Sequence, residues 1–95
     1  MAIINSLTDF HAWQKARELN KQLFVLLNHS KYNQHKDLKN QILKSSRSVM
    51  ANLAEGFARI GNKEFINFIS IAKGSLGELK SDIIICYDFE LLTAE

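Results

Sequence analysis

Small polar and charged side chains recur at helical spacing in the middle of this 95-residue chain, and side chains of these types bind ligands or transfer protons. Successive members stand four, three, four, three and four residues apart: Gln41, Ser45, Ser48, Asn52, Glu55 and Arg59. Steps of three and four place them along one edge of a helix. A second group follows downstream and could face that edge: Gly74, Ser75, Glu78 and Asp82.

Three interpretations of this polar edge stay open. We favour a hydrogen-bonded network that ties two helices together, in which Glu55 and Arg59 form an ion pair in the favourable order, acid first. The alternatives are a binding site and a solvated edge. Gly74 and Gly77 each cost a helix about 1 kcal/mol relative to alanine, so we expect another backbone to approach closely at these glycines.

The remaining chemistry-bearing residues do not form a catalytic or metal-binding pattern. No glutamate is followed three positions later by a histidine, as a carboxylate di-metal site requires. Cys86 lies in an apolar stripe and is expected in the core. Asn52, Glu55 and Glu78 could act as acid and base, but nothing supplies a nucleophile. We therefore expect a non-enzymatic protein with no cofactor, metal or small-molecule substrate, and surface positions for its histidines, His11, His29 and His35.

Charge is uneven along the chain. Residues 1–63 hold ten basic and four acidic residues, a balance of +6, whereas residues 64–95 hold two basic and six acidic ones, a balance of −4. Solvated helix faces explain most such asymmetries, but cations gathered on one face would bind the phosphates of RNA or DNA. Tyr32 is the single candidate for stacking on a base. The candidate phosphate-binding residues are Lys15, Arg17, Lys21, Lys36, Lys39, Lys44 and Arg47.

Apolar periodicity predicts three helices, at about 9–27, 37–59 and 63–92, in one helical-bundle domain spanning residues 1–95. Thr8 is the expected N-cap of the first helix. The connection 28–36 has no apolar periodicity and is expected to be a loop. The stripe of the first helix comprises Ala12, Ala16, Leu19, Leu23 and Leu26, and that of the third comprises Ile69, Ala72, Leu76, Leu79, Ile83 and Cys86.

The second and third helices carry more apolar surface than a small monomer is expected to cover. The helix at 37–59 shows two apolar faces, one through Ile42 and Val49 and one through Leu43 and Met50. Residues 83–87 are apolar all round. A chain of this length buries only about two-thirds of its unfolded surface, so we expect a homo-oligomer.

Composition agrees with a small α-helical protein of a reducing compartment. The 46% hydrophobic and 23% charged content is that of a globular chain. Proline is absent and glycine occurs four times, which argues against a hairpin-rich β protein. One cysteine excludes an internal disulfide. The first ten residues do not resemble a signal peptide, and no apolar run approaches the roughly 20 residues that span a bilayer. A cytoplasmic protein with no membrane partner is expected.

The segment 48–59, SVMANLAEGFAR, resembles the signature of a bacterial four-helix-bundle family named after the intervening sequences of 23S ribosomal RNA genes. Residues that follow this pattern at consistent spacing cover nearly the whole chain. Upstream they are Phe10, Trp13, Gln14, Ala16 and Leu19; downstream they are Glu64, Phe65, Phe68, Ile71, Ala72, Gly74, Ser75, Glu78 and Leu79. The motif residues Gln41, Ser48, Asn52, Glu55, Gly56, Arg59, Gly74, Ser75 and Glu78 are those assigned to the polar network.

The resemblance implies an all-α antiparallel bundle that assembles as a ring, typically a pentamer, with no assigned catalytic activity. A related branch is similar to the accessory protein of diversity-generating retroelements, which contacts nucleic acid. Two departures stand out: Leu43 and Lys44 replace two arginines, and Met50 replaces a proline. The chain reaches Glu95 where the family's fourth helix would begin, so the resemblance implies three helices of the bundle with the fourth missing.

Overall fold

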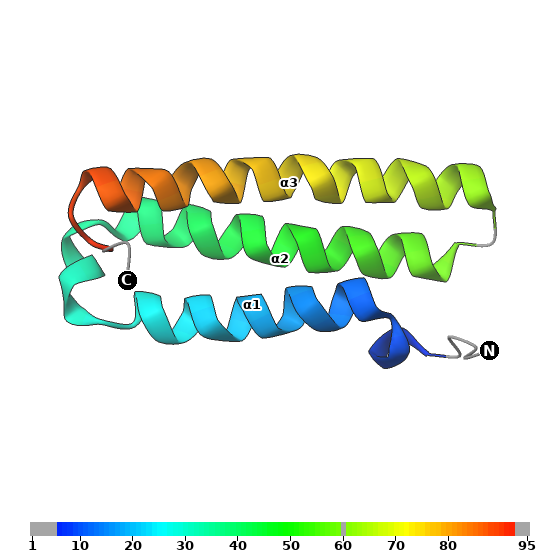
Figure 1. Cartoon of the computed structure of the whole chain (residues 1–95), viewed down its shortest axis with the longest axis horizontal. Helices are drawn as coiled ribbons and strands as arrows, with labels where there is room; N and C mark the ends of the chain where they lie inside the picture. The colour runs from blue at the N-terminus through cyan, green and yellow to red at the C-terminus, as the bar shows by residue number, and fades with distance from the viewer. Residues whose placement is uncertain (1–5, 60, 93–95) are drawn as a thin grey trace.

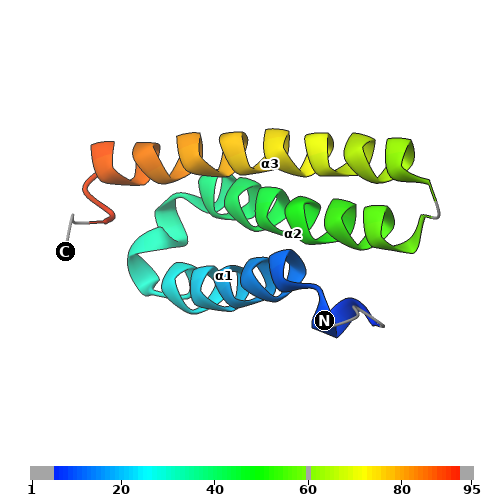
Figure 2. The same ribbon diagram turned by 45° about the vertical axis from the view of Figure 1, so that its right-hand side comes forward.

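The computed structural model describes residues 6–59 and 61–92, and within these ranges every regular element is a helix. The three long helices are α1 (His11–Leu27), α2 (Lys36–Ala58) and α3 (Asn62–Asp88), as Figures 1 and 2 show. Two short 3₁₀ helices, η1 (Leu7–Asp9) and η2 (Ser30–Gln34), precede α1 and α2. The predicted all-α fold is confirmed.

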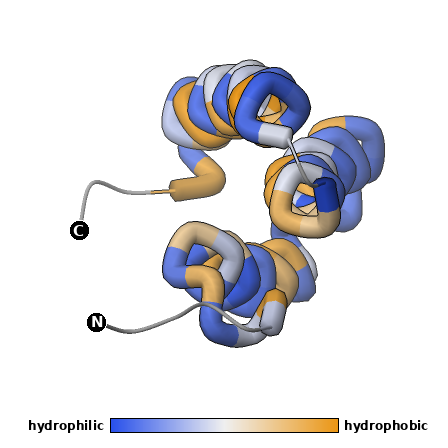
Figure 3. The backbone as a smooth tube through the Cα atoms, turned by 90° about the vertical axis from the view of Figure 1, so that its right-hand side faces the viewer, coloured by the Kyte–Doolittle hydropathy of each residue, from blue (hydrophilic) through white to orange (hydrophobic). Residues whose placement is uncertain are grey.

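α2 lies between the other two helices and packs against both. The molecule is elongated, with extents of 44 × 22 × 21 Å. Seen end-on, the three helices occupy three corners of a square, and the corner opposite α2 lies open between α1 and α3 (Figure 3). Residues 6–59 and 61–92 therefore form a bundle whose fourth helix position is empty, in agreement with the expected architecture.

The central position of α2 explains its two apolar faces. Side chains on both faces are buried or half-buried within this chain, including Ile42, Leu43, Val49 and Met50. The two apolar faces of α2 therefore do not require a second subunit, contrary to the expectation from the sequence. α3, in contrast, exposes large apolar side chains to solvent, among them Ile84 and Tyr87.

The core consists of two clusters, one towards each end of the bundle. The cluster nearer the end of α3 contains Leu23, Leu27, Tyr32, Ile42, Leu79, Cys86 and Leu91. The other contains Ala16, Val49, Leu53 and Ala72, with Phe10, Trp13, Met50 and Ile69 packed against it. Cys86 is fully buried, which confirms its predicted place in the core.

Two predicted helix ends differ from the structure. Thr8 is not the N-cap of α1, because residues 7–9 form the 3₁₀ helix η1 and Phe10 occupies the cap position without a side-chain hydrogen bond. α3 ends at Asp88 rather than near residue 92. Glu90 adopts a left-handed φ of 60°, and the amide of Leu91 donates to the carbonyl of Cys86 at 2.8 Å.

The connection between α1 and α2 is a structured part of the core. Tyr32, in η2, is fully buried, and its hydroxyl donates to the carbonyl of Leu91 at 3.2 Å. This bond joins residues 59 positions apart in the sequence. Tyr32 is therefore unavailable to stack on a base, and the suggestion that it does so was wrong.

Close backbone approach occurs at a different glycine from those expected. A Cβ atom added to Gly56 on α2 would lie 3.1 Å from the Cβ of Phe68 and 3.5 Å from the ring of Phe65, both on α3. At Gly74 and Gly77 no neighbouring atom of residues 6–59 and 61–92 lies within 4 Å of such an atom. The expectation of a close approach at Gly74 and Gly77 is therefore wrong within this chain, and Gly56 permits the contact between α2 and α3.

Alanine substitution distinguishes a glycine in a close helix contact, Gly56, from a glycine in open space, Gly77. Gly77→Ala should raise the free energy of unfolding by about 1 kcal/mol, because it gains helix propensity without a clash. Gly56→Ala gains the same propensity but overpacks Phe68, which costs about 1–3 kcal/mol. Urea denaturation should place Gly56→Ala at least 1 kcal/mol below Gly77→Ala, and equal stabilities would contradict the packing described at Gly56.

Candidate functional site

The centre of the polar edge links α2 to α3. The hydroxyl oxygens of Ser48 and Ser75 lie 2.8 Å apart, within hydrogen-bond distance across the two helices. The side-chain amide of Asn52 donates to the backbone carbonyl of Ser48 at 2.8 Å and to its hydroxyl at 3.2 Å. All three side chains are half-buried. The structure thus brings together three residues of the predicted network.

The other residues of the predicted network lie apart from this centre. Glu55 and Arg59 form an ion pair 3.1 Å long, but both side chains are about half exposed. The Arg59 guanidinium also lies 5.3 Å from the ring centre of Phe68. Exposed pairs of this kind contribute about 0.2–1 kcal/mol. Gln41 donates to Ser45 at 3.5 Å. Glu78 and Gly74 are exposed, and no side-chain hydrogen bond joins Glu78 to the centre within the described part of the chain.

Among the titratable groups along this polar edge, the carboxyl group of Asp82 is the one most shielded from water. Its Oδ2 atom is buried and has no hydrogen-bond partner among the described residues. Burial raises the pKa of the Asp82 carboxyl above its ordinary value, and the neighbouring charge of Glu78 raises it further. Burial and a like charge both disfavour the ionised form, so the charged carboxylate destabilises the fold at neutral pH.

Asp82→Asn should therefore raise the urea midpoint at pH 7. A raised carboxyl pKa contributes stability that is present below the unfolded-state value of about 3.9 and is lost as pH rises through the folded-state pKa. The gain from asparagine should accordingly shrink as the pH is lowered below 4. Asp88→Asn removes an exposed carboxylate at the C-terminal end of the same helix and should gain only the roughly 0.3–1 kcal/mol of an unfavourable contact with the helix dipole. A lower midpoint for Asp82→Asn at pH 7 would show that the carboxylate makes a favourable contact.

A second polar link, between α1 and α2, was not found from the sequence. Ser46 is buried, and its hydroxyl donates to the side-chain carbonyl of Asn20 at 3.1 Å. Ser46 lies beside the periodic polar edge but not on it, so spacing along one helix could not reveal it. Ser45, the residue before Ser46, is buried as well.

The candidate phosphate-binding residues do not share one face. Lys36, Lys44 and Arg47 fall within about 80° around α2, at 3.6 residues per turn. Lys21 joins Arg47 in a hollow on α1 and α2 that Phe24 also lines. The remaining three cations are dispersed: Lys15 lines a different groove, Arg17 lies over the Trp13 ring at 5.7 Å, and Lys39 is half-buried.

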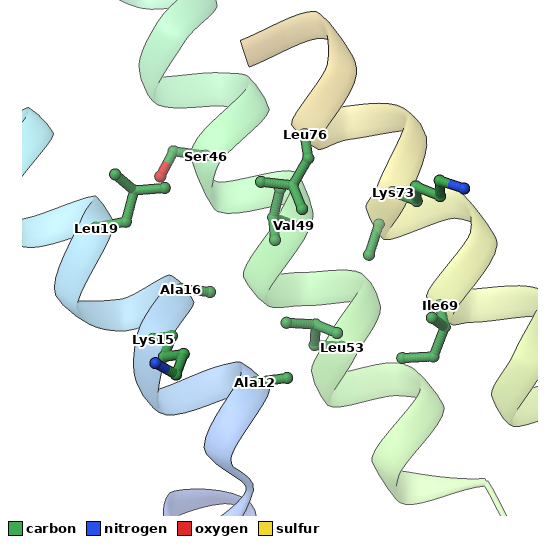
Figure 4. A pocket seen from close by; sticks show the side chains of 11 residues that line it. Ala12, Lys15, Ala16, Leu19, Ser46, Val49, Leu53, Ile69, Lys73 and Leu76 are labelled. Carbon is green, nitrogen blue, oxygen red and sulfur yellow. The ribbon is translucent and has the colours of Figure 1, made fainter. Parts of the chain in front are cut away.

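The open corner of the bundle forms an apolar groove of about 390 Å³ (Figure 4). Buried side chains of α2, Val49 and Leu53, form its floor. Side chains of α1 and α3 form its walls, with Lys15 on one wall and Lys73 on the other. The lining residues are Ala12, Lys15, Ala16, Leu19, Ser46, Val49, Leu53, Ile69, Ala72, Lys73 and Leu76.

The groove is suited to receive apolar side chains. Its lining contains two lysines and one serine, and neither an acidic residue nor a histidine.

Over residues 6–59 and 61–92, no three histidine, cysteine, aspartate or glutamate side chains lie close enough to hold a metal ion. None of the helices described is both long enough and apolar enough to cross a membrane.

One comparison with known proteins finds a relationship. A family model described as 23S rRNA-intervening sequence protein matches residues 8–95, which include α1, α2 and α3. No curated protein and no solved structure matches the chain.

Proposed function

Because the chain belongs to the 23S rRNA-intervening sequence protein family, we propose that it is a non-enzymatic assembly module that works as a homo-oligomer, with a pentamer favoured. The observation that best supports the proposal is the number of large apolar side chains that α3 exposes to solvent. Single exposed apolar residues are ordinary. On α3 and its end, however, they include Ile66, Ile71, Leu76, Ile84, Tyr87 and Phe89.

Two exposed isoleucines lie on the same outward side of α3, at either end of a stretch that also carries Lys73 and Lys80. Ile66 is 63% exposed and Ile84 is 50% exposed, and they stand 18 residues apart, which is five helical turns. Both therefore lie on the same side of α3, about 27 Å apart along its axis. Full burial of such a side chain contributes about 1.5–3 kcal/mol, so burial of both isoleucines against another subunit would favour assembly.

The proposal includes a cytoplasmic location, for which the support is a single cysteine, Cys86, that is buried and unpaired.

We predict that light scattering at tens of micromolar gives a mass several times the 10.9 kDa of one chain. Ile84→Glu should reduce that mass, because it places a charge in the proposed contact. Ala51→Glu changes an exposed apolar side chain on α2 in the same way and should leave the mass unchanged. A wild-type mass of about 11 kDa at this concentration would contradict the proposal.

A second candidate function, nucleic-acid binding, has one specific observation in its favour. Phe24 is 59% exposed and lines the hollow that also contains Lys21 and Arg47. An exposed aromatic ring beside two cations can stack on a base while the cations contact phosphates. Lys36 and Lys44 extend the positive surface along the outward face of α2.

This second function predicts steep salt dependence. Contact with six or more phosphates should weaken binding about 10³-fold between 50 and 200 mM salt, measured by fluorescence anisotropy with single-stranded and duplex probes. The double variant Lys44→Glu/Arg47→Glu should weaken binding to every sequence, because phosphate contacts carry no base information. Lys80→Glu on α3 makes the same type of charge change elsewhere and should have little effect. Absence of binding at 50 mM salt would exclude the function.

A further inference from the structure

We infer that the hollow between α1 and α2 binds one unpaired guanine nucleotide, whose base stacks on Phe24 and accepts hydrogen bonds from Asn20 and Arg47. The inference rests on the second candidate function, nucleic-acid binding, and adds to it the base that the site selects. The hollow has a volume of about 360 Å³ and is lined by Asn20, Lys21, Phe24, Leu43 and Arg47. Sites for small ligands begin at about 300 Å³, so one nucleotide can be accommodated.

A buried hydroxyl determines which end of the Asn20 side chain is open to a ligand. The hydroxyl of Ser46, a buried residue, donates to Oδ1 of Asn20 at 3.1 Å. Within residues 6–59 and 61–92 the Nδ2 atom of Asn20 has no hydrogen-bond partner, and it is not among the atoms shielded from solvent. Asn20 therefore presents a hydrogen-bond donor to the hollow, while its acceptor is already engaged.

The other polar side chains of the hollow also donate hydrogen bonds. Nε of Arg47 donates to the carbonyl of Leu43, one turn earlier on α2, at 3.4 Å, which leaves its terminal Nη groups for a ligand. Lys21 lies 4.0 Å from Glu18, and both side chains are more than 60% exposed, so this ion pair is weak. The lining contains no aspartate, glutamate or histidine. The hollow thus offers positive charge and hydrogen-bond donors.

A lining that donates hydrogen bonds favours a base edge that accepts them. Guanine presents two adjacent acceptors, O6 and N7, whereas adenine presents N7 beside an amino group that donates. Asparagine ordinarily recognises adenine with both its carbonyl and its amide, but the carbonyl of Asn20 is engaged by Ser46. The ring of Phe24 can stack on any base that has a free face, so the donors decide the preference and the base must be unpaired.

The probes are fluorescein-labelled DNA strands of eleven nucleotides with a single base, guanine or adenine, at the centre and abasic sites elsewhere. The two strands have identical phosphates, so a difference in affinity reports the base. Fluorescence anisotropy at 50 mM salt should show the guanine strand binding about tenfold tighter than the adenine strand. Competition with guanosine monophosphate identifies the source of the nucleotide. Displacement of the strand at concentrations near the Kd of the strand assigns a free nucleotide to the hollow, and displacement only far above that Kd assigns a nucleotide within a strand.

Asn20→Asp tests the role of the donor. The variant keeps an acceptor for the Ser46 hydroxyl and replaces Nδ2 with an oxygen, so the guanine preference should disappear or reverse. The added negative charge weakens binding of both strands, and the readout is therefore the ratio of their Kd values. Gln22→Glu makes the same change from amide to acid at an exposed position of α1 outside the hollow and should leave the ratio unchanged. Thermal melts by circular dichroism establish that both variants are folded.

Phe24→Leu tests the stacking platform, and it should weaken binding of both strands alike. Equal affinity of the unaltered chain for the two strands, or a guanine preference that survives Asn20→Asp, would overturn the inference and leave nucleic-acid binding in place. Absence of binding to either strand would overturn the function and the inference together. A drop in oligomer mass for Phe24→Leu would also overturn the inference, because the hollow would then hold a second copy of the chain.

Discussion

α2 has to bury side chains on two neighbouring sides at once, one against α1 and one against α3 (Figure 3), and the arrangement of the rest of the molecule depends on this requirement. Val49 and Leu53 belong to the core cluster that also contains Ala16 of α1 and Ala72 of α3. The Ser46 hydroxyl donates to Asn20 on α1, and the hydroxyls of Ser48 and Ser75 lie within hydrogen-bond distance across α2 and α3. α1 and α3 each pack against α2 and not against each other, so the space between them stays open. The open groove is therefore the geometric result of the same packing that stabilises the chain.

Polar residues make two different contributions to this arrangement. Ser48, Asn52 and Ser75 satisfy one another where α2 meets α3, because unpaired polar groups in a buried contact are costly. Glu55 and Arg59 belong to the same periodic edge but lie near its solvent-facing end, where an ion pair is weak. Asp82 is the exception, since its buried oxygen lacks a partner and its charge opposes folding.

The helices could be predicted from the sequence because their apolar stripes are regular and long. α1 and α2 begin and end within two residues of the expected positions, apart from the 3₁₀ helix at Thr8. The end of α3 was misplaced because its left-handed residue is Glu90 rather than a glycine, so nothing in the sequence marks the turn. The burial of Tyr32 was not predicted, because contact with a segment far away in the sequence leaves no periodic pattern around residue 32. The groove depends on where α1 lies relative to α3, which no pattern within a single helix encodes.

The bond between Tyr32 and Leu91 has a consequence for the order in which the chain folds. α2 and α3 are consecutive in sequence, as are α1 and α2, so each pair can form through local contacts with a low loop-closure entropy. The Tyr32 hydroxyl, in contrast, needs a carbonyl 59 residues away, which is in position only after both helix pairs have formed. Closure of this end of the bundle is therefore expected among the last events of folding. The same hydrogen bond joins the turn after α3 to the connection before α2. Local opening of the bundle should therefore begin at the opposite end, beside η1 and the start of α3.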